Sequence, residues 1–121
     1  MMYRFFSQTD FDRATPRCSI DDMSVRFMSR LDQAREYAGV PFIVNSAYRT
    51  VEHEKAKGRD GTSSHIKGIA VDLKATNSRT RYKILQGLLK VGFTRIGIGK
   101  NFIHVDEDEE KDQDVIWTYY D

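Results

Sequence analysis

The chain has 121 residues, a length that fits one domain and is too short for two. Its 19 basic and 18 acidic side chains give a formal net charge of +1 and are mixed along most of the sequence, so no field of one sign attracts nucleic acid or an anionic membrane. No apolar stretch reaches the length of a secretory signal or a membrane span. We therefore expect one soluble, monomeric domain over residues 1–121, made in the cytoplasm, that needs a separate release step to act outside it.

Cysteine and histidine are scarce, which limits the metal chemistry open to this chain. Cys18 is the one cysteine, so an intrachain disulfide and a thiolate-rich zinc site are both excluded. Any bound metal must therefore use nitrogen and oxygen ligands. The three histidines, His53, His65 and His104, are the first candidates.

Helical and extended patterns alternate through the first half of the chain. Residues 19–39 predict a helix whose cap is Ser19 or Asp21. A short apolar strand follows at residues 41–49. The polar segment 50–64 is long for a loop in so small a domain, so we expect it to be functional, partly helical or mobile. The helical residues that we expect in the core are Phe27, Leu31, Ala34 and Ala38.

The second half favours strands around one helix. Residues 70–74 alternate like a strand, and residues 77–92 predict a helix with Tyr82, Leu85 and Leu89 on its apolar side. The acidic stretch 107–114 is typical of a solvated turn. The later strands, expected to form antiparallel hairpins, cover residues 93–99, 102–106 and 115–120. This order predicts an α+β domain with an antiparallel sheet and helices packed on one side.

Two of these strands each carry an ionisable side chain on the face opposite their apolar residues. Because side chains alternate along a strand, Asp72 projects away from Val71 and Leu73, and His104 has the same relation to the apolar residues of its own strand. If the two strands pair, Asp72 and His104 can lie side by side. His65, seven residues before Asp72, can then close over the same point.

Two imidazoles and one carboxylate form a ligand set that suits zinc and also iron(II). Three protein ligands leave a fourth position open for water, and an open position indicates catalysis. In the alternative interpretation, His65 is an exposed loop histidine, Asp72 is a strand-end charge and His104 is a hydrogen-bonded sheet residue. Spacing alone does not decide between these interpretations.

The segment "SSHIKGIAVDLK" (residues 63–74) together with "FIHVD" (residues 102–106) resembles the zinc site of the M15 metallopeptidases. This family comprises the D-alanyl-D-alanine carboxypeptidases and phage cell-wall endopeptidases, with the pattern S-x-H-x-x-G-x-A-x-D and a later strand histidine. The segments "SAYRT" and "GFTRIGIGKNFIHVD" are also similar to family patterns. The resemblance covers nearly the whole chain and implies a fold like that of the DD-peptidases and the hedgehog signalling domain.

The resemblance also implies roles for individual residues. His65, Asp72 and His104 match the family's zinc ligands, and the metal would polarise the scissile carbonyl and acidify a bound water. Arg49 matches a basic residue that binds the substrate carboxylate or carbonyl, where its guanidinium could stabilise an oxyanion. Ser63 matches the serine that orders the loop before the first histidine.

The position of the general base departs from the family pattern. Many members carry Asp or Glu three residues before the last histidine; this chain has Asn101 there, and an amide cannot take a proton from water. Asn101 is left as a substrate-binding candidate. Asp106, about 7 Å beyond His104 along the strand, can act through water or by orienting a ligand histidine, and we favour the second role. Glu52 and Glu54 are further candidates if the long polar segment folds over the site.

The resemblance thus implies a zinc-dependent metallopeptidase that cuts peptidoglycan, either as a D-Ala-D-Ala carboxypeptidase or as a stem-peptide endopeptidase such as a phage lysis enzyme. The rival interpretation is a catalytically silent zinc module that binds cell-wall peptide or a protein partner. Asn101 and the architecture shared with the hedgehog domain keep that rival open. A third interpretation is a metal-free structural subunit, for which His65→Ala or His104→Ala would change neither metal content nor stability.

Overall fold

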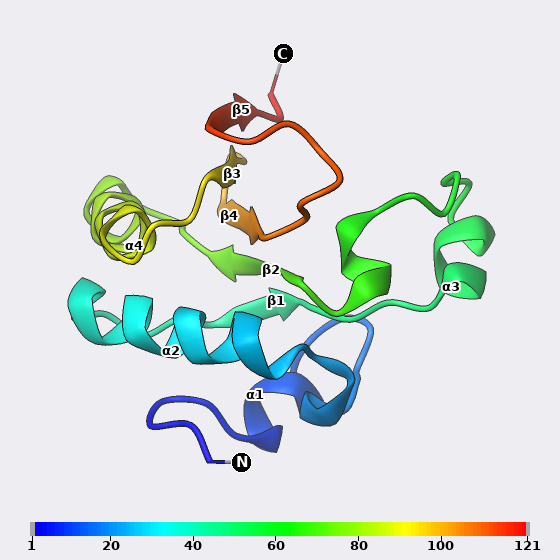
Figure 1. The fold of residues 1–121 in the computed structure, drawn as a ribbon, viewed down its shortest axis with the longest axis horizontal. Coiled ribbons are helices and arrows are strands. Elements are labelled where there is room, and N and C mark those ends of the chain that lie inside the picture. Colours follow the sequence, from blue (N-terminus) through cyan, green and yellow to red (C-terminus); the bar gives the residue numbers. More distant parts are fainter. Residues whose placement is uncertain (1, 121) are drawn as a thin grey trace.

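The computed structural model describes residues 2–120 and is α+β, as the sequence predicts (Figure 1). The helices are α1 (Gln8–Asp12), α2 (Val25–Ala38), α3 (Val51–Ala56) and α4 (Ser78–Lys90), with two short 3-10 turns, η1 (Ile20–Asp22) and η2 (Ser64–Lys67). The strands are β1 (Val44–Ser46), β2 (Ala70–Lys74), β3 (Arg95–Ile98), β4 (Phe102–Asp106) and β5 (Val115–Thr118). Within residues 2–120, no helix combines the length and apolarity that a membrane span requires.

The five strands form one mixed sheet in the order β1-β2-β4-β3-β5. All neighbouring pairs are antiparallel except β3 and β5, which run parallel. The expectation of a wholly antiparallel sheet is therefore wrong for the last strand. Because β2 and β3 occupy both edges of β4, the chain leaving β4 pairs with the nearby free edge of β3. It enters that edge beside the first residue of β3, so β5 must run in the same direction as β3.

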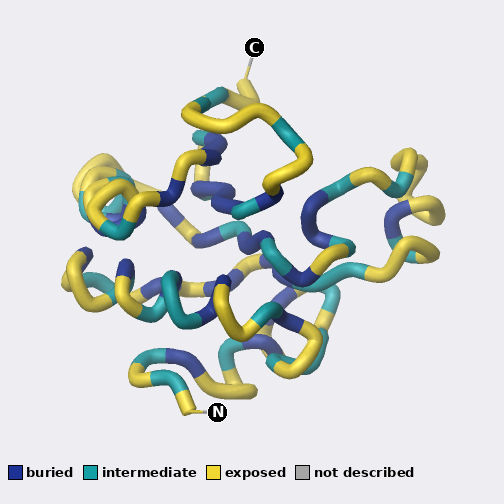
Figure 2. Tube along the Cα trace, in the orientation of Figure 1, coloured by how far each residue is buried: buried dark blue, intermediate teal, exposed yellow. Residues whose placement is uncertain are grey.

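Helices α2 and α4 pack together against one face of the sheet, as expected, and the core lies between them and the strands. Figure 2 shows the buried stretches of chain, in dark blue, along the strands and the inner side of α2. Val71 and Leu73 of β2 and Ile103 and Val105 of β4 point into this core. Its members include Phe27, Met28, Leu31, Ile84, Leu88, Val71, Leu73, Ile103 and Val105. The polar side chains of β2 and β4 lie on the other face of the sheet.

Helix α2 begins later than the sequence predicts. The hydroxyl of Ser24 accepts a hydrogen bond from Phe27 N and caps the helix, whereas Ser19 caps the separate turn η1. The helix ends at Gly39, whose φ of 69° is left-handed. All four residues predicted for its core stripe are buried, namely Phe27, Leu31, Ala34 and Ala38.

Helix α4 has the predicted extent, but its buried face differs from the expected one. Tyr82 and Leu89 are 63% and 50% exposed, so the expected apolar stripe is wrong. Ile84, Gly87 and Leu88 are buried instead. Both stripes follow helical spacing, and close packing against α2 selects the one that contains Gly87. A Cβ atom at Gly87 would lie 2.4 Å from the carbonyl oxygen of Ala34.

We predict that Gly87→Ala destabilises the fold by about 1–3 kcal/mol, because the added methyl overpacks the contact between α2 and α4. Helix propensity alone would give the opposite sign, a gain of about 1 kcal/mol. Urea unfolding of the variant measures the difference. Gln86→Ala, at the exposed neighbouring position, is the matched control and should stay within about 0.5 kcal/mol of the parent. A more stable Gly87→Ala variant would contradict the close contact.

Candidate metal centre

One row of residues runs across the whole sheet on the face away from the core. Asp72 of β2 pairs with Ser46 of β1 on one side and with His104 of β4 on the other. His104 pairs in turn with Gly97 of β3, and Gly97 pairs with Trp117 of β5. The strand pairing predicted for Asp72 and His104 is therefore confirmed. Each of the five strands contributes one residue to this row.

His65 reaches the row from the turn η2, which precedes β2. Ser63 caps this turn by accepting a hydrogen bond from His65 N, and Gly68 ends it with a left-handed φ of 70°. The His65 ring donates its Nδ1–H to the carbonyl oxygen of Ala47 at 2.7 Å. This bond fixes the orientation of the ring and places Nε2 3.4 Å from Asp72 Oδ1.

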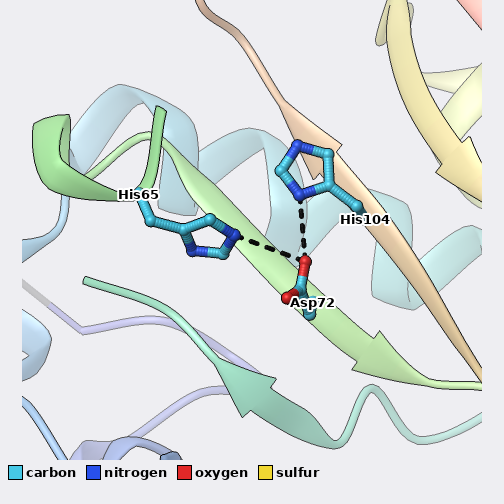
Figure 3. Close-up of side chains that lie close together, drawn as sticks. All are labelled: His65, Asp72 and His104. Atoms are coloured by element: carbon cyan, nitrogen blue, oxygen red, sulfur yellow. Dashed lines mark hydrogen bonds and ion pairs between the residues drawn. The ribbon is translucent and has the colours of Figure 1, made fainter. Parts of the chain in front are cut away.

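His65, Asp72 and His104 converge on one point (Figure 3), where each offers a ligand atom and these atoms lie within 4.8 Å of one another. His104 Nδ1 is 2.9 Å from Asp72 Oδ1. Burial alone would raise the pKa of Asp72, but its bonds to His104 and His65 outweigh burial and hold that pKa well below its usual range. The group is therefore an ionised carboxylate between two imidazoles, a donor set that could hold a divalent metal.

Asp106 fixes the second ligand histidine from behind. His104 Nε2–H donates to Asp106 Oδ2 at 2.6 Å, which leaves Nδ1 directed at the metal position. The other oxygen of Asp106 accepts hydrogen bonds from Arg95 Nε at 2.7 Å and from Asp108 N at 3.0 Å. Burial would lower the pKa of His104, but its contacts with Asp106 and Asp72 raise it. A divalent metal would therefore compete with a proton on this ring.

Arg49 and Ser63 lie together beside the ligand group, whereas Asn101 does not. Arg49 donates to Ser46 Oγ at 3.0 Å and to Ser63 Oγ at 3.5 Å. Its Nε also lies 3.3 Å from a carboxylate oxygen of Glu54, the buried residue of α3. Asn101 occupies the exposed turn between β3 and β4 and is absent from the lining of the cavity at the ligand group.

The polar segment 50–64 is partly helical and folds over the ligand group. Its helix α3 places Glu54 in the wall of the cavity, while Glu52 is exposed to solvent. The Oε2 atom of Glu54 accepts a hydrogen bond from Arg59 at 2.7 Å. Its Oε1 atom is buried and has no hydrogen-bond partner within residues 2–120. His53 faces away and lines a separate small pocket.

The cavity in front of the three ligands has a volume of about 470 Å³ and two unlike walls. One wall is charged, with Arg49, Arg59 and Lys111 beside the carboxylates of Glu54 and Asp60, and the other is aromatic, with Phe102, Trp117 and Tyr119. The sequence analysis assigned no site role to Trp117 or Tyr119. Alternation along residues 115–120 would have put Trp117 and Tyr119 on one face, but only the pairing of β5 with β3 shows that this face belongs to the cavity.

The acidic stretch 107–114 is not simply a solvated turn, because Asp108 is 1% exposed. Its carboxylate accepts hydrogen bonds from Ser64 Oγ at 2.7 Å and from Lys67 Nζ at 2.9 Å. These contacts join the turn that carries His65 to the segment that follows His104. Burial opposes ionisation, but the bonds from Lys67 and Ser64 outweigh it and lower the pKa of Asp108 to about 2.

Comparison with known protein families gives one result that bears on this geometry. The family model described as Peptidase M15 matches residues 6–106. The matched region contains all three ligand residues and ends at the last residue of β4, before the acidic stretch and β5. No curated protein matches the chain.

We predict that Asp108→Asn destabilises the protein by about 1–2 kcal/mol at pH 7, because Lys67 and Ser64 lose their charged partner. The pKa in the folded state lies below the unfolded value of about 3.9. The contribution of Asp108 is therefore complete above pH 4 and is lost as the pH falls toward 2. Denaturant unfolding at pH 7, 5 and 3 should show the difference between parent and variant shrinking with acidity.

Glu110→Gln is the matched control, since this side chain is 84% exposed and lies 3.6 Å from the same lysine. Its stability should stay close to that of the parent at every pH. A difference between Asp108→Asn and the parent that does not change between pH 7 and pH 3 would contradict the assignment of the effect to this charge.

Proposed function

The chain belongs to the M15 peptidase family, and from this premise we propose that it is a zinc-dependent metallopeptidase that hydrolyses peptide bonds of bacterial cell-wall peptidoglycan. The observation that carries the proposal is the convergence of His65 Nε2, Asp72 Oδ1 and His104 Nδ1 at the floor of an open cavity. We propose that the protein works as a monomer, and that it reaches the cell wall after release from the cytoplasm.

In this proposal His65, Asp72 and His104 hold the zinc ion. When bound, zinc supplies Lewis acidity toward the scissile carbonyl and lowers the pKa of water. Asp106 orients His104 and keeps its Nε2 protonated, so that Nδ1 stays available. Both oxygens of Asp106 already accept hydrogen bonds, which favours this orienting role over proton abstraction.

Arg49 is the residue that we assign to substrate binding. Its planar guanidinium lines the cavity and is held by Ser46 and Ser63, so it is oriented before substrate arrives. In this position it would bind a carbonyl or carboxylate oxygen of the peptide. Ser63 supports the same function indirectly, since it both contacts Arg49 and caps the turn that carries His65.

Glu54 is our candidate for the residue that accepts the proton during attack by water. It is buried in the cavity wall, and its Oε1 has no partner within residues 2–120, so this oxygen can accept a proton through an intervening water. Arg49 and Arg59 hold the other oxygen in place. Asn101 has neither the chemistry nor the position for this role.

A second function, a zinc module that binds cell-wall peptide without cutting it, is favoured by Asn101 at the usual position of the family's base. The activity of the variant Asn101→Asp distinguishes the two functions. If Asn101→Asp cleaves peptidoglycan and the parent does not, the natural protein lacks a base and the binding function holds. Equal cleavage by both proteins would exclude a requirement for a carboxylate at that position.

The first test is digestion of purified peptidoglycan by the protein as isolated, after chelation and after zinc is returned, with mass spectrometry of the fragments. We expect zinc-dependent release of D-Ala or of cleaved stem peptides, and loss of this activity in His104→Ala. The identity of the fragments distinguishes a carboxypeptidase from an endopeptidase. Bound zinc without cleavage in any sample would reject the peptidase and favour the binding module.

We predict that Glu54→Gln lowers kcat by about 10²–10⁴-fold if Oε1 accepts the proton, since that is the usual contribution of a general base. The amide keeps the size of the side chain and can still accept a hydrogen bond from Arg59, so zinc content should be unchanged. Glu52→Gln, two residues away on the exposed side of α3, is the matched control. Equal activity of the two variants would rule out Glu54 as the base.

A further inference from the structure

The aromatic wall of the cavity, formed by Phe102, Trp117 and Tyr119, lies next to a metal ligand. The Trp117 ring centroid is 5.6 Å from that of His104, and the Tyr119 centroid is 6.5 Å from it. Phe102 and Tyr119 pack at 5.2 Å and Trp117 and Tyr119 at 6.2 Å, so the three rings form one continuous surface. They lie on the face of the sheet opposite the core, so the core does not account for them.

Two glycines of the β3 region make room for this wall. Gly97 lies between His104 and Trp117 in the row across the sheet, and a Cβ atom there would be 2.6 Å from the Tyr119 ring and 2.7 Å from Trp117 Nε1. A Cβ atom at Gly99 would likewise overlap the ring of Phe102. Because both positions lack a side chain, the rings can lie against the strand and close to the ligand group.

One ring of the wall, that of Trp117, is also held by a charged neighbour. The Arg95 guanidinium lies 4.9 Å from the centre of the Trp117 ring. The same guanidinium donates to Asp106, which holds His104. The orientation of Trp117 and that of the ligand histidine are therefore set by one chain of contacts. A rigid aromatic surface loses little conformational entropy when it binds a partner.

We propose that Trp117, Tyr119 and Phe102 form a substrate subsite that accepts an uncharged, apolar side chain of the residue next to the scissile bond. The subsite rests on the proposed peptidase function and adds a specificity determinant to it. Trp117 and Tyr119 lie beyond the region that the family model matches, so two of the three rings come from the segment that follows the matched region.

The charges around the cavity decide which side chain fits the wall. Arg95 already occupies one face of Trp117, so a cationic side chain would meet like charge at the rings. Arg95 is itself paired with Asp106, so an anionic side chain would lose hydration against the rings without gaining a free ion-pair partner there. An apolar side chain is the one that gains by covering the exposed rings.

The test uses four synthetic stem peptides that differ only in the residue beside the cleaved bond. That residue is Gly, Ala, Ser or Asp. For the zinc-loaded parent we expect Ala to lower KM relative to Gly by about fourfold, the effect of one buried methyl group, with no such gain for Ser or Asp. In Trp117→Ala and Tyr119→Ala the preference for Ala should vanish and KM should rise, while kcat and bound zinc stay near the parental values.

Tyr120→Ala is the matched control, because Tyr120 is 61% exposed and does not line the cavity. Its preference for Ala should equal that of the parent. Gly97→Ala should weaken the preference for Ala without removing a ring, because the new methyl displaces Tyr119. An unchanged preference in Trp117→Ala and Tyr119→Ala would overturn the subsite. Loss of zinc in both variants would also overturn it, since the rings would then only support His104.

A second readout separates the subsite from the peptidase function. Trp117 is the only tryptophan of the chain, so its fluorescence reports directly on this wall. Stopped-flow mixing of the zinc-loaded protein with the Ala peptide should shift the emission of Trp117 to shorter wavelength before any turnover. If the protein cleaves none of the peptides, the fluorescence shift alone tests the subsite. A shift with the Ala peptide and not with the Asp peptide supports the subsite. The absence of a shift with the Ala peptide rejects it.

Discussion

The antiparallel register between β2 and β4 is the constraint on which the rest of the site depends. It sets Asp72 opposite His104 and, with the same pairing, directs Val71, Leu73, Ile103 and Val105 into the core. A shift of one residue in either strand would turn its ionisable side chain into the core and expose its apolar residues. The hydrophobic effect that stabilises the sheet therefore also fixes the position of two candidate metal ligands. His65 is added by a short capped turn at the start of β2.

Behind the ligands lies a network of buried charges that connects the segments of the site. Asp106 holds His104 and is itself held by Arg95, and Asp108 joins the turn of His65 to the segment after β4. Buried charges cost solvation free energy, and here each carboxylate recovers part of it through hydrogen bonds to a cation or a backbone N–H. Such a network contributes more to the orientation of side chains than to net stability. A metal site needs well-oriented side chains, since ligand geometry determines how tightly a metal is held.

The site draws on two parts of the chain with different contributions. The region matched by the family model supplies the three candidate metal ligands and the arginine beside them. The segment after it supplies Lys111, Trp117 and Tyr119, which form parts of the two walls of the cavity. The two contributions are linked, because Trp117 of β5 lies beside the ring of His104 and against the guanidinium of Arg95.

The sequence by itself determined the α+β class, the residue types available for a metal, the faces of β2 and β4, and the core stripe of α2, because alternation and helical spacing are local properties of the chain. The tertiary structure decided the rest. The parallel pairing of β5 follows from the occupied edges of β4, and the buried stripe of α4 follows from close contact with α2 at Gly87. The burial of Asp108, the position of Glu54 in the cavity wall and the absence of Asn101 from it depend on which distant segments meet. Contacts of this kind join residues far apart in sequence, and no local pattern encodes them.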